Sequence, residues 1–299
     1  MSRAAWALFG ALGAIWGIPY LLIKVATSGV TPAVLVCGRT SLGALVLLPI
    51  ALYRRELAPV LALWRPLLAY TAVELVVPWY LLASAEQRLP SSLSALVVAA
   101  VPILGAVLAR TTGARERLGP ARLAGLATGA TGVAVLVGFD VQGADLGAVG
   151  ELLVVVAGYS LGPWIFHRHL TQLPGVGVAV ASLLGCAAFY APFAALELPR
   201  RMPSADVLLS IAGLGVLCTA TAFLVFFALI AQVGPARATV VTYVNPAVAV
   251  LAGVTVLHEP FGWSTGLGFV LILAGSLLAA RPYSSRRPVW ARRSARRAA

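Results

Sequence analysis

The sequence predicts an all-α membrane protein with ten transmembrane helices, arranged as two inverted repeats of five helices. The composition is 60% hydrophobic and 11% charged, with a mean hydropathy of +0.94, whereas soluble domains carry about 25% charged residues. Apolar runs long enough to cross a bilayer follow one another along the whole chain, and the second half repeats landmarks of the first. No soluble core could bury this much apolar surface, so lipid must be the solvent.

The first five spans are apolar windows of about 18–25 residues, the length that crosses the hydrocarbon core. The first follows Arg3, and because similar runs continue to the end of the chain, we interpret it as a span and not as a cleaved signal peptide. Basic residues end or follow the first four windows, most densely between the fourth and the fifth. The expected ranges are 5–24, 32–53, 66–85, 91–109 and 121–138.

The last five spans are also apolar windows of about 18–25 residues. The sixth window ends in the run "HRH", the ninth ends before "HEP", and the tenth ends at Arg281. Their ranges are 147–167, 175–196, 207–231, 236–257 and 263–280. The loops between all ten windows are too short to hold a soluble domain.

The distribution of positive charge predicts the orientation. Of the 22 Lys and Arg residues, 17 lie on the side of the N-terminus, four lie on the opposite side, and Arg39 lies inside a span. Cytoplasmic loops carry the excess of positive charge, so we expect both termini in the cytoplasm. The net charge of +12 is explained in this way and not by nucleic-acid binding, because no basic face interleaved with aromatic residues is present.

Internal similarity relates the two halves. Pro102 and Pro246 match at a shift of about 144 residues, and Glu116 matches Glu259 at about 143. Two glycine pairs, 125 with 268 and 132 with 275, keep the same shift and suit close helix packing. An odd number of spans per repeat inverts the second copy, a signature of transporters. We expect repeats at 1–142 and 143–281, followed by a disordered basic tail at 282–299 that contacts anionic lipid or only fixes the topology.

Several short motifs together resemble the EamA-type transporters of the drug/metabolite transporter superfamily. They are "AIWGIPYLLIK" in the first span, Arg39 in the second, a proline in the fourth, and "RERL" before a glycine-spaced fifth span. The second half contributes "NPAVAVL…HEP" and "GLGFVLILAG". The resemblance covers the chain up to about residue 281. It implies a ten-helix bundle of two inverted repeats and the export of small metabolites by alternating access, often proton-coupled.

Glu74 is the sharpest site candidate, because it is the acid placed well inside a span. A charge at the bilayer centre costs about 2.5–3.5 kcal/mol on insertion scales, so Glu74 should face a cavity or a cation, or be protonated. Pro78 removes the amide that would bond the carbonyl of Glu74. Arg39 lies at a similar expected depth and is the natural partner. Arg39 could instead bond to freed carbonyls or to an anionic group of a substrate.

The first span holds two further candidates. Trp16, near Gly17 and Pro19, lines the cavity or only packs against neighbours. Lys24 ends the span, where it snorkels to the interface or contacts a substrate at an outer gate. In the third span we interpret Trp79 and Tyr80 as belt residues at the interface.

A polar cluster surrounds the helix breaker of the ninth span. Pro246 frees the carbonyl of Thr242, and Tyr243 and Asn245 stand beside it. Freed backbone groups in lipid must be satisfied by neighbours or by water in a cavity. We therefore expect Tyr243 and Asn245 to contact substrate, or else to form bonds between helices.

Further proline breaks repeat this pattern. Pro102 frees the carbonyl of Val98, and Pro163 frees that of Tyr159, a weaker substrate-binding candidate. Glu116 and Glu259 follow matched spans, and we expect them to serve helix ends.

We expect an exporter of small metabolites, such as amino acids or drug-like compounds, in the inner membrane, with membrane lipid and protons as its further partners. A nucleotide-sugar-like carrier is the runner-up within transport, and few cations beyond Arg39 are available for it. Two further classes stay open, a passive channel and a membrane enzyme acting on lipid-linked substrates. The three cysteines lie in apolar runs without paired spacing, and no cofactor or metal motif is evident.

Overall fold

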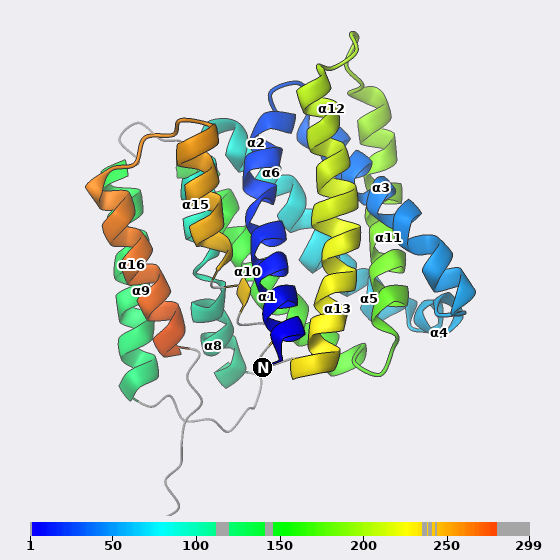
Figure 1. The fold of residues 1–299 in the computed structure, drawn as a ribbon, viewed down its shortest axis with the longest axis horizontal. Coiled ribbons are helices and arrows are strands. Elements are labelled where there is room, and N and C mark those ends of the chain that lie inside the picture. Colours follow the sequence, from blue (N-terminus) through cyan, green and yellow to red (C-terminus); the bar gives the residue numbers. More distant parts are fainter. Residues whose placement is uncertain are drawn as a thin grey trace, which may run out of the picture.

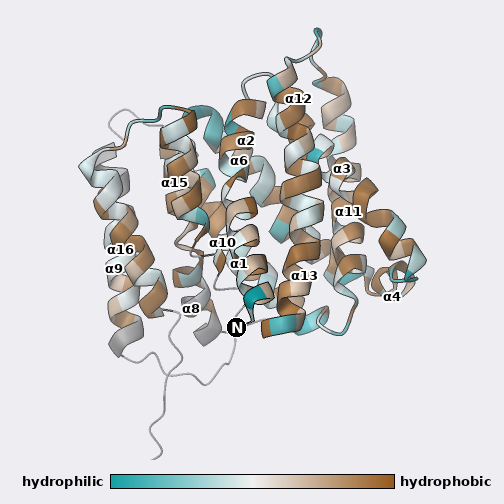
Figure 2. Cartoon of the chain, in the orientation of Figure 1, coloured by the Kyte–Doolittle hydropathy of each residue, from teal (hydrophilic) through white to brown (hydrophobic). Residues whose placement is uncertain are grey.

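The structure is a computed structural model that describes residues 2–111, 120–140, 146–234, 238, 241–242 and 244–279. Every regular element within these ranges is a helix (Figure 1). Six helical spans are long and apolar enough to cross a membrane: Arg3–Ala26, Pro32–Tyr53, Trp64–Arg88, Leu146–His169, Gly175–Leu196 and Ala205–Val233. Four shorter apolar helical stretches accompany them: Ser91–Gly105, Leu123–Val135, Asn245–Val256 and Trp263–Leu278. Figure 2 shows apolar residues along most of the labelled helices, as expected for a chain in lipid.

The first half of the chain contains the first five expected spans. Helices α1 (Arg3–Gly17) and α2 (Pro19–Ala26) form one span with a turn at Ile18, and α3 (Pro32–Tyr53) forms the next. A short helix, α4 (Leu57–Ala62), precedes a continuous span built from α5 (Trp64–Thr71), the π-helix η1 (Ala72–Val76) and α6 (Val77–Arg88). Helices α7 (Ser91–Val98), α8 (Val101–Thr111) and α9 (Pro120–Asp140) complete this half.

The second half begins with two uninterrupted helices, α10 (Leu146–His169) and α11 (Gly175–Leu196). The next span joins α12 (Ala205–Ala212), the π-helix η2 (Gly213–Thr221) and α13 (Ala222–Val233). Helices α15 (Asn245–Val256) and α16 (Trp263–Ala279) follow. The predicted windows 32–53 and 175–196 coincide with α3 and α11, while the first part of the predicted window 236–257 lies mostly outside the described residues.

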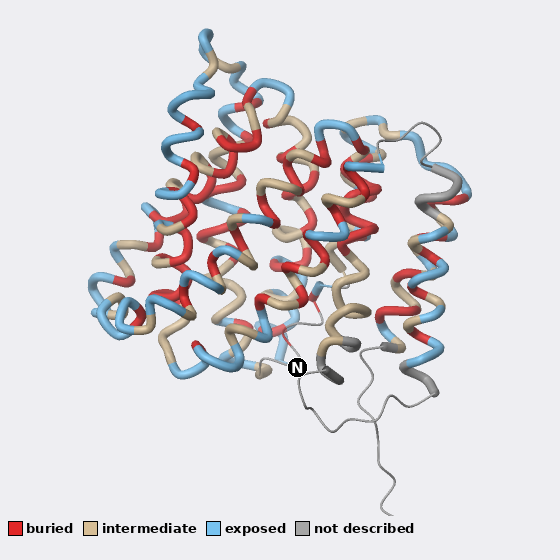
Figure 3. The backbone as a smooth tube through the Cα atoms, turned by 180° about the vertical axis from the view of Figure 1, so that it is seen from behind, coloured by how far each residue is buried: buried red, intermediate tan, exposed pale blue. Residues whose placement is uncertain are grey.

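Small residues allow helices distant in sequence to pack closely. Helices α9 and α16 lie side by side at one end of the molecule (Figure 1). A β-carbon at Gly275 would lie 2.6 Å from the α-carbon of Gly129, so only glycine permits this approach. The predicted packing role is confirmed for Gly275 and for Gly132, where a β-carbon would lie 2.8 Å from Leu271 Cβ. Buried residues lie mainly where helices face one another (Figure 3).

Two carboxylates cap helices from the opposite half of the chain. The backbone N–H groups of Ser91 and Ser92 donate to Glu259 Oε1 at 2.7 Å and Oε2 at 3.0 Å, at the start of α7. The N–H of Gly177, in the first turn of α11, donates to Glu56 Oε2 at 2.8 Å. Such groups satisfy orphan donors and favour the positive end of the helix dipole. The predicted helix-end role of Glu259 is confirmed, whereas Glu116 lies outside the described residues.

The capping bonds set the ionisation of Glu259, which lies in the loop after α15. Partial burial on its own would raise the pKa of this carboxyl. The hydrogen bonds from Ser91 and Ser92 favour the charged form and outweigh burial, so the pKa of Glu259 is lowered. Its carboxylate is therefore a fixed link between α15 and α7.

Candidate functional site

The centre of the molecule holds a cluster of polar groups from four spans. The Arg39 guanidinium of α3 lies over the Trp79 ring of α6, 3.7 Å from its centroid. Arg39 Nε donates to Thr219 Oγ1 of η2 at 3.1 Å, and the Trp79 side chain is a hydrogen-bonding neighbour of the Tyr159 hydroxyl on α10. Arg39 is only 8% exposed. The positive charge of Arg39 is thus stabilised by the face of the Trp79 ring and by the Thr219 hydroxyl oxygen.

The prediction that Arg39 pairs with Glu74 is wrong. The Arg39 guanidinium instead lies over the Trp79 ring and donates to the Thr219 hydroxyl. The sequence places both groups at a similar depth, but depth does not fix the direction in which each helix turns its side chain. The same contact corrects the interpretation of Trp79 as a belt residue, since its ring is 9% exposed beneath Arg39.

Glu74 lies in η1 and packs against α10. A β-carbon on Gly162 would overlap its Oε2 atom, and the hydroxyl-bearing residues Tyr70 and Tyr159 lie within electrostatic range of its carboxyl. Oε2 is buried without a hydrogen-bond partner among the described residues. Glu151, by contrast, forms an ion pair with Arg88 at 2.6 Å. Within the described ranges, Glu74 is therefore an intramembrane acid without a structural cation.

The π-helix η1 lies directly before Pro78, the second residue of α6. Pro78 lacks an amide hydrogen, so the regular bonding pattern cannot continue through this turn, and short π segments often mark functional sites. The Pro78 ring packs against Gly158 of α10. Pro163 behaves differently, because α10 continues through it without a break.

The fourth span is broken at Pro102 as expected. Helix α7 ends at Val98 and α8 begins at Val101. The Ser276 hydroxyl of α16 donates to the Ala99 carbonyl at 2.9 Å, and the Ser160 hydroxyl of α10 donates to the Val101 carbonyl at 3.2 Å. The amide of Ile103 bonds to the Ala100 carbonyl, so the Ala99 carbonyl is left open, and the Ser276 hydroxyl satisfies it.

A second break precedes α15, which begins at Asn245 with Pro246 in its first turn. Asn245 Oδ1 is buried without a hydrogen-bond partner among the described residues. Gly17 of α1 packs here, since a β-carbon on it would lie 2.9 Å from the Asn245 carbonyl oxygen. Tyr243 lies outside the described residues.

The two candidates of the first span lie in different surroundings. The Trp16 ring packs against Phe226 of α13 at a centroid distance of 5.0 Å, within an apolar cluster around Leu12. Lys24 Nζ donates to the carbonyls of Glu86 at 2.5 Å and Leu89 at 2.9 Å. Lys24 therefore serves the C-terminal end of α6, where helix carbonyls lack partners.

Sequence reasoning missed one buried acid, Glu86. Its side chain is fully buried, and neither carboxylate oxygen has a hydrogen-bond partner among the described residues. Lys24, Glu259 and Arg39 are the charged groups near it. Glu86 lies near the end of a span, a position that is typical of a residue at the membrane interface. Only the packing of α2, α6 and α7 shows that its side chain is enclosed. Among the described residues, no group of three or more His, Cys, Asp or Glu side chains could hold a metal ion.

Both halves of the chain match a single family model. The model of the EamA-like transporter family matches at residues 4–138 and again at residues 148–281. The chain belongs to the EamA-like transporter family. These matches cover most of the chain and agree with the resemblance carried by the motifs of the first, fourth and ninth spans.

Two curated relatives of this EamA-family protein are themselves named as transporters. The inner membrane transporter YedA of Escherichia coli (strain K12), described as uncharacterized, is 29% identical over 256 residues, covering 82% of this chain and 81% of YedA. The uncharacterized transporter YvbV of Bacillus subtilis (strain 168) is 24% identical over 270 residues, covering 88% of this chain and 87% of YvbV. The family and these relatives indicate a multi-pass membrane transporter and not an enzyme.

A solved structure titled "Crystal structure of protein" shares the fold. It aligns with a TM-score of 0.65 and 20% sequence identity, covering 98% of this chain and 99% of that chain. At this identity the likeness shows the fold alone.

Proposed function

We propose that this protein is a secondary active transporter that exports small metabolites across the inner membrane by alternating access, with Glu74 carrying a coupling proton. One observation carries the proposal: Glu74 Oε2 is buried inside a span without a hydrogen-bond partner among the described residues. An intramembrane acid is costly and belongs to an ion or substrate pathway by default. No described cation competes for this carboxyl, so it is free to exchange a proton.

Alternating access requires two units that move against each other. We take these units to be residues 1–142 and 143–281, each with five spans and in opposite orientation, with both termini in the cytoplasm. The double family match supports two units. The π segments support the same division, because η1 lies in the third expected span and η2 in the eighth. The excess of positive charge on one side supports the orientation.

The polar groups near the helix breaks favour a small polar or amphipathic substrate. Asn245 offers a buried amide oxygen without a partner among the described residues, and Tyr159 offers a hydroxyl beside Trp79. Arg39 would position an anionic group, such as a carboxylate, by exchanging its contact with Thr219. We include Tyr243 in this set from its sequence position. Trp16 packs against Phe226 and Lys24 caps the C-terminal end of α6. These two residues contribute to the shape of the site and not to substrate contact.

Proteoliposomes containing the purified protein and a trapped pH-sensitive dye test this function. Panels of amino acids and drug-like amines are added, and both proton movement and substrate accumulation are recorded. We expect Glu74→Gln to abolish proton movement, while Asp206→Asn, which removes an exposed carboxylate, leaves it unchanged. Arg39→Lys keeps the charge but loses the planar stack on Trp79, and should reduce transport of anionic or zwitterionic compounds about tenfold or less.

Two outcomes would contradict the proposal. Full proton dependence in Glu74→Gln would exclude this residue as the coupling group. Substrate that only equilibrates across the membrane, and never accumulates under an imposed pH gradient, would indicate a passive channel.

A further inference from the structure

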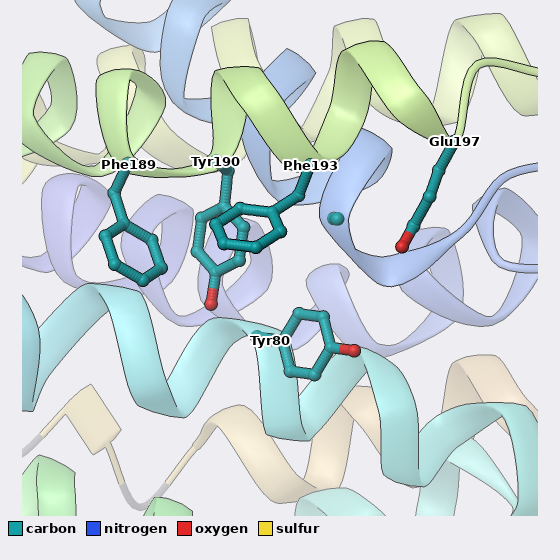
Figure 4. A pocket seen from close by; sticks show the side chains of 6 residues that line it. Tyr80, Phe189, Tyr190, Phe193 and Glu197 are labelled. Atoms are coloured by element: carbon teal, nitrogen blue, oxygen red, sulfur yellow. The ribbon is translucent and has the colours of Figure 1, made fainter.

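A pocket lies at the C-terminal end of α11, and none of its lining residues belongs to the Arg39 cluster. We call it the aromatic pocket; its lining residues are Ala33, Tyr80, Phe189, Tyr190, Phe193 and Glu197. Its volume is about 150 Å³. Figure 4 shows the three rings of α11 facing Tyr80 of α6, with the Glu197 carboxylate at one side.

The rings of this pocket present aromatic faces and edges to one small space. Tyr80 and Tyr190 are stacked with centroids 5.7 Å apart and an interplanar angle of 5°. Phe189 meets Tyr190 edge-on at 5.0 Å, and Phe193 lies 6.3 Å from Tyr190. The faces of aromatic rings carry a negative quadrupole that attracts cations within about 6 Å of the centroid.

The pocket is held in place by its own framework. The Tyr190 hydroxyl donates to the Val76 carbonyl at 2.8 Å, at the end of η1, and the side chain is 6% exposed. Glu197 is the C-cap of α11, and its N–H bonds to the Phe193 carbonyl at 3.0 Å. Phe189 and Phe193 remain 51% and 47% exposed, so one side of the pocket stays open.

The pocket has one charged lining group, the Glu197 carboxylate. Within the part of the chain that the structure describes, the Glu197 side chain has no ion pair or hydrogen bond. An anion would be repelled by this carboxylate and by the ring faces. A strongly hydrated metal ion would find a single ligand and apolar walls. A cation whose charge is spread over apolar groups can contact the aromatic walls and also pair with the Glu197 carboxylate.

We propose that the aromatic pocket binds an organic ammonium cation through the ring faces, with Glu197 as the counter-charge. The site lies beyond the proposed transport function, since it requires neither Glu74 nor movement between two states. The same ammonium chemistry occurs in free metabolites and in the headgroups of phosphatidylcholine and phosphatidylethanolamine. The pocket recognises this shared chemistry, and the experiment separates the two sources.

The test uses the purified full chain in lipid-free neutral detergent and ligand-observed NMR, which detects weak binding. Choline is titrated beside 3,3-dimethylbutan-1-ol, a neutral molecule of nearly the same shape. We expect saturable binding of choline and at least about fivefold weaker binding of the alcohol, because only choline carries the charge that the ring faces and the Glu197 carboxylate attract. Equal binding of both molecules would overturn the proposal, because apolar contact alone would then explain it.

Matched variants locate the site. Phe193→Leu and Glu197→Gln should each weaken choline binding about five- to thirtyfold, while Phe261→Leu and Asp206→Asn, which remove an exposed ring and an exposed acid elsewhere, should not. Size-exclusion profiles verify that each variant is folded. Choline affinity that is unchanged in both pocket variants would refute the assignment, and Glu197→Gln alone decides the matter if Phe193→Leu fails to fold.

Lipid nanodiscs distinguish the two sources of the cation. Choline affinity that falls in phosphatidylcholine discs relative to phosphatidylglycerol discs would assign the pocket to a lipid headgroup. Equal affinity in both would assign it to a free cation, and absence of binding in detergent and in both discs would overturn the proposal. Choline binding is measured without any transport step. If Glu74 proves not to couple protons in proteoliposomes, the result of the binding experiment still stands.

Discussion

Adding one methyl group at Gly162 tests whether Glu74 is held against α10. A β-carbon there would lie 2.9 Å from Glu74 Cδ and 3.0 Å from Glu74 Cβ, and would overlap Oε2. Carbon atoms pack best at about 3.5–4.0 Å. Rotating the carboxyl could relieve the contact with Oε2, but not the contact with Cβ, so α10 and η1 must separate slightly.

The matched control lies in the same helix. Gly150→Ala meets no atom within 4 Å, so it should only gain helix propensity, up to about 1 kcal/mol. Gly162→Ala receives the same gain, but overpacking costs about 1–3 kcal/mol. We therefore expect Gly162→Ala to be less stable than Gly150→Ala by about 1–3 kcal/mol.

Unfolding titrations in SDS, followed by circular dichroism, measure this difference. Adding Glu74→Ala to Gly162→Ala removes Cδ and both oxygens but keeps Cβ, so the double variant should recover part of the loss, and the cycle isolates the contribution of the carboxyl group. If Gly162→Ala is as stable as Gly150→Ala, or if Glu74→Ala recovers nothing, the placement of Glu74 against α10 is refuted.

Two further predictions concern the helix ends and the helix break. The lowered pKa of Glu259 means that its stabilisation is complete above the unfolded value of about 4.3 and is lost as the pH falls through the folded pKa. Glu259→Gln should therefore cost about 1–2 kcal/mol at pH 7 and much less in acid, and a pH-independent difference in SDS unfolding would argue against the cap. Ser276→Ala should leave the Ala99 carbonyl without its donor and destabilise the protein by about 0.6 kcal/mol, whereas the exposed Ser28→Ala should have a smaller effect; the same titrations measure both, and equal effects would mean that the bond to Ala99 is not formed.

Span positions could be predicted from the sequence because hydropathy is a local property. A segment enters lipid according to its own composition and length, so the windows 32–53 and 175–196 coincide with α3 and α11. The break near Pro102 agrees with the loss of a backbone donor at proline, but α10 continues through Pro163, so a proline by itself does not fix a break. The intramembrane position of Glu74 followed from the same local pattern.

Contacts between spans were not predictable in this way. Arg39 and Glu74 share an expected depth, yet Arg39 meets Trp79 and Thr219 instead. Glu86 lies near a span end in the sequence and is fully buried in the structure. The hydroxyl of Ser276 that serves the break at Pro102 comes from a segment more than 170 residues away, and no local pattern identifies it.

The amino-acid sequence alone determined that lipid is the solvent, where the apolar helices run and that Glu74 lies within one of them. Only the tertiary structure decided which side chains meet: Arg39 with Trp79, Glu259 with the start of α7, and Tyr80 with Tyr190 of α11. The physical reason is that insertion depends on each segment separately, whereas these contacts depend on how each helix is rotated and packed against partners far away in the chain.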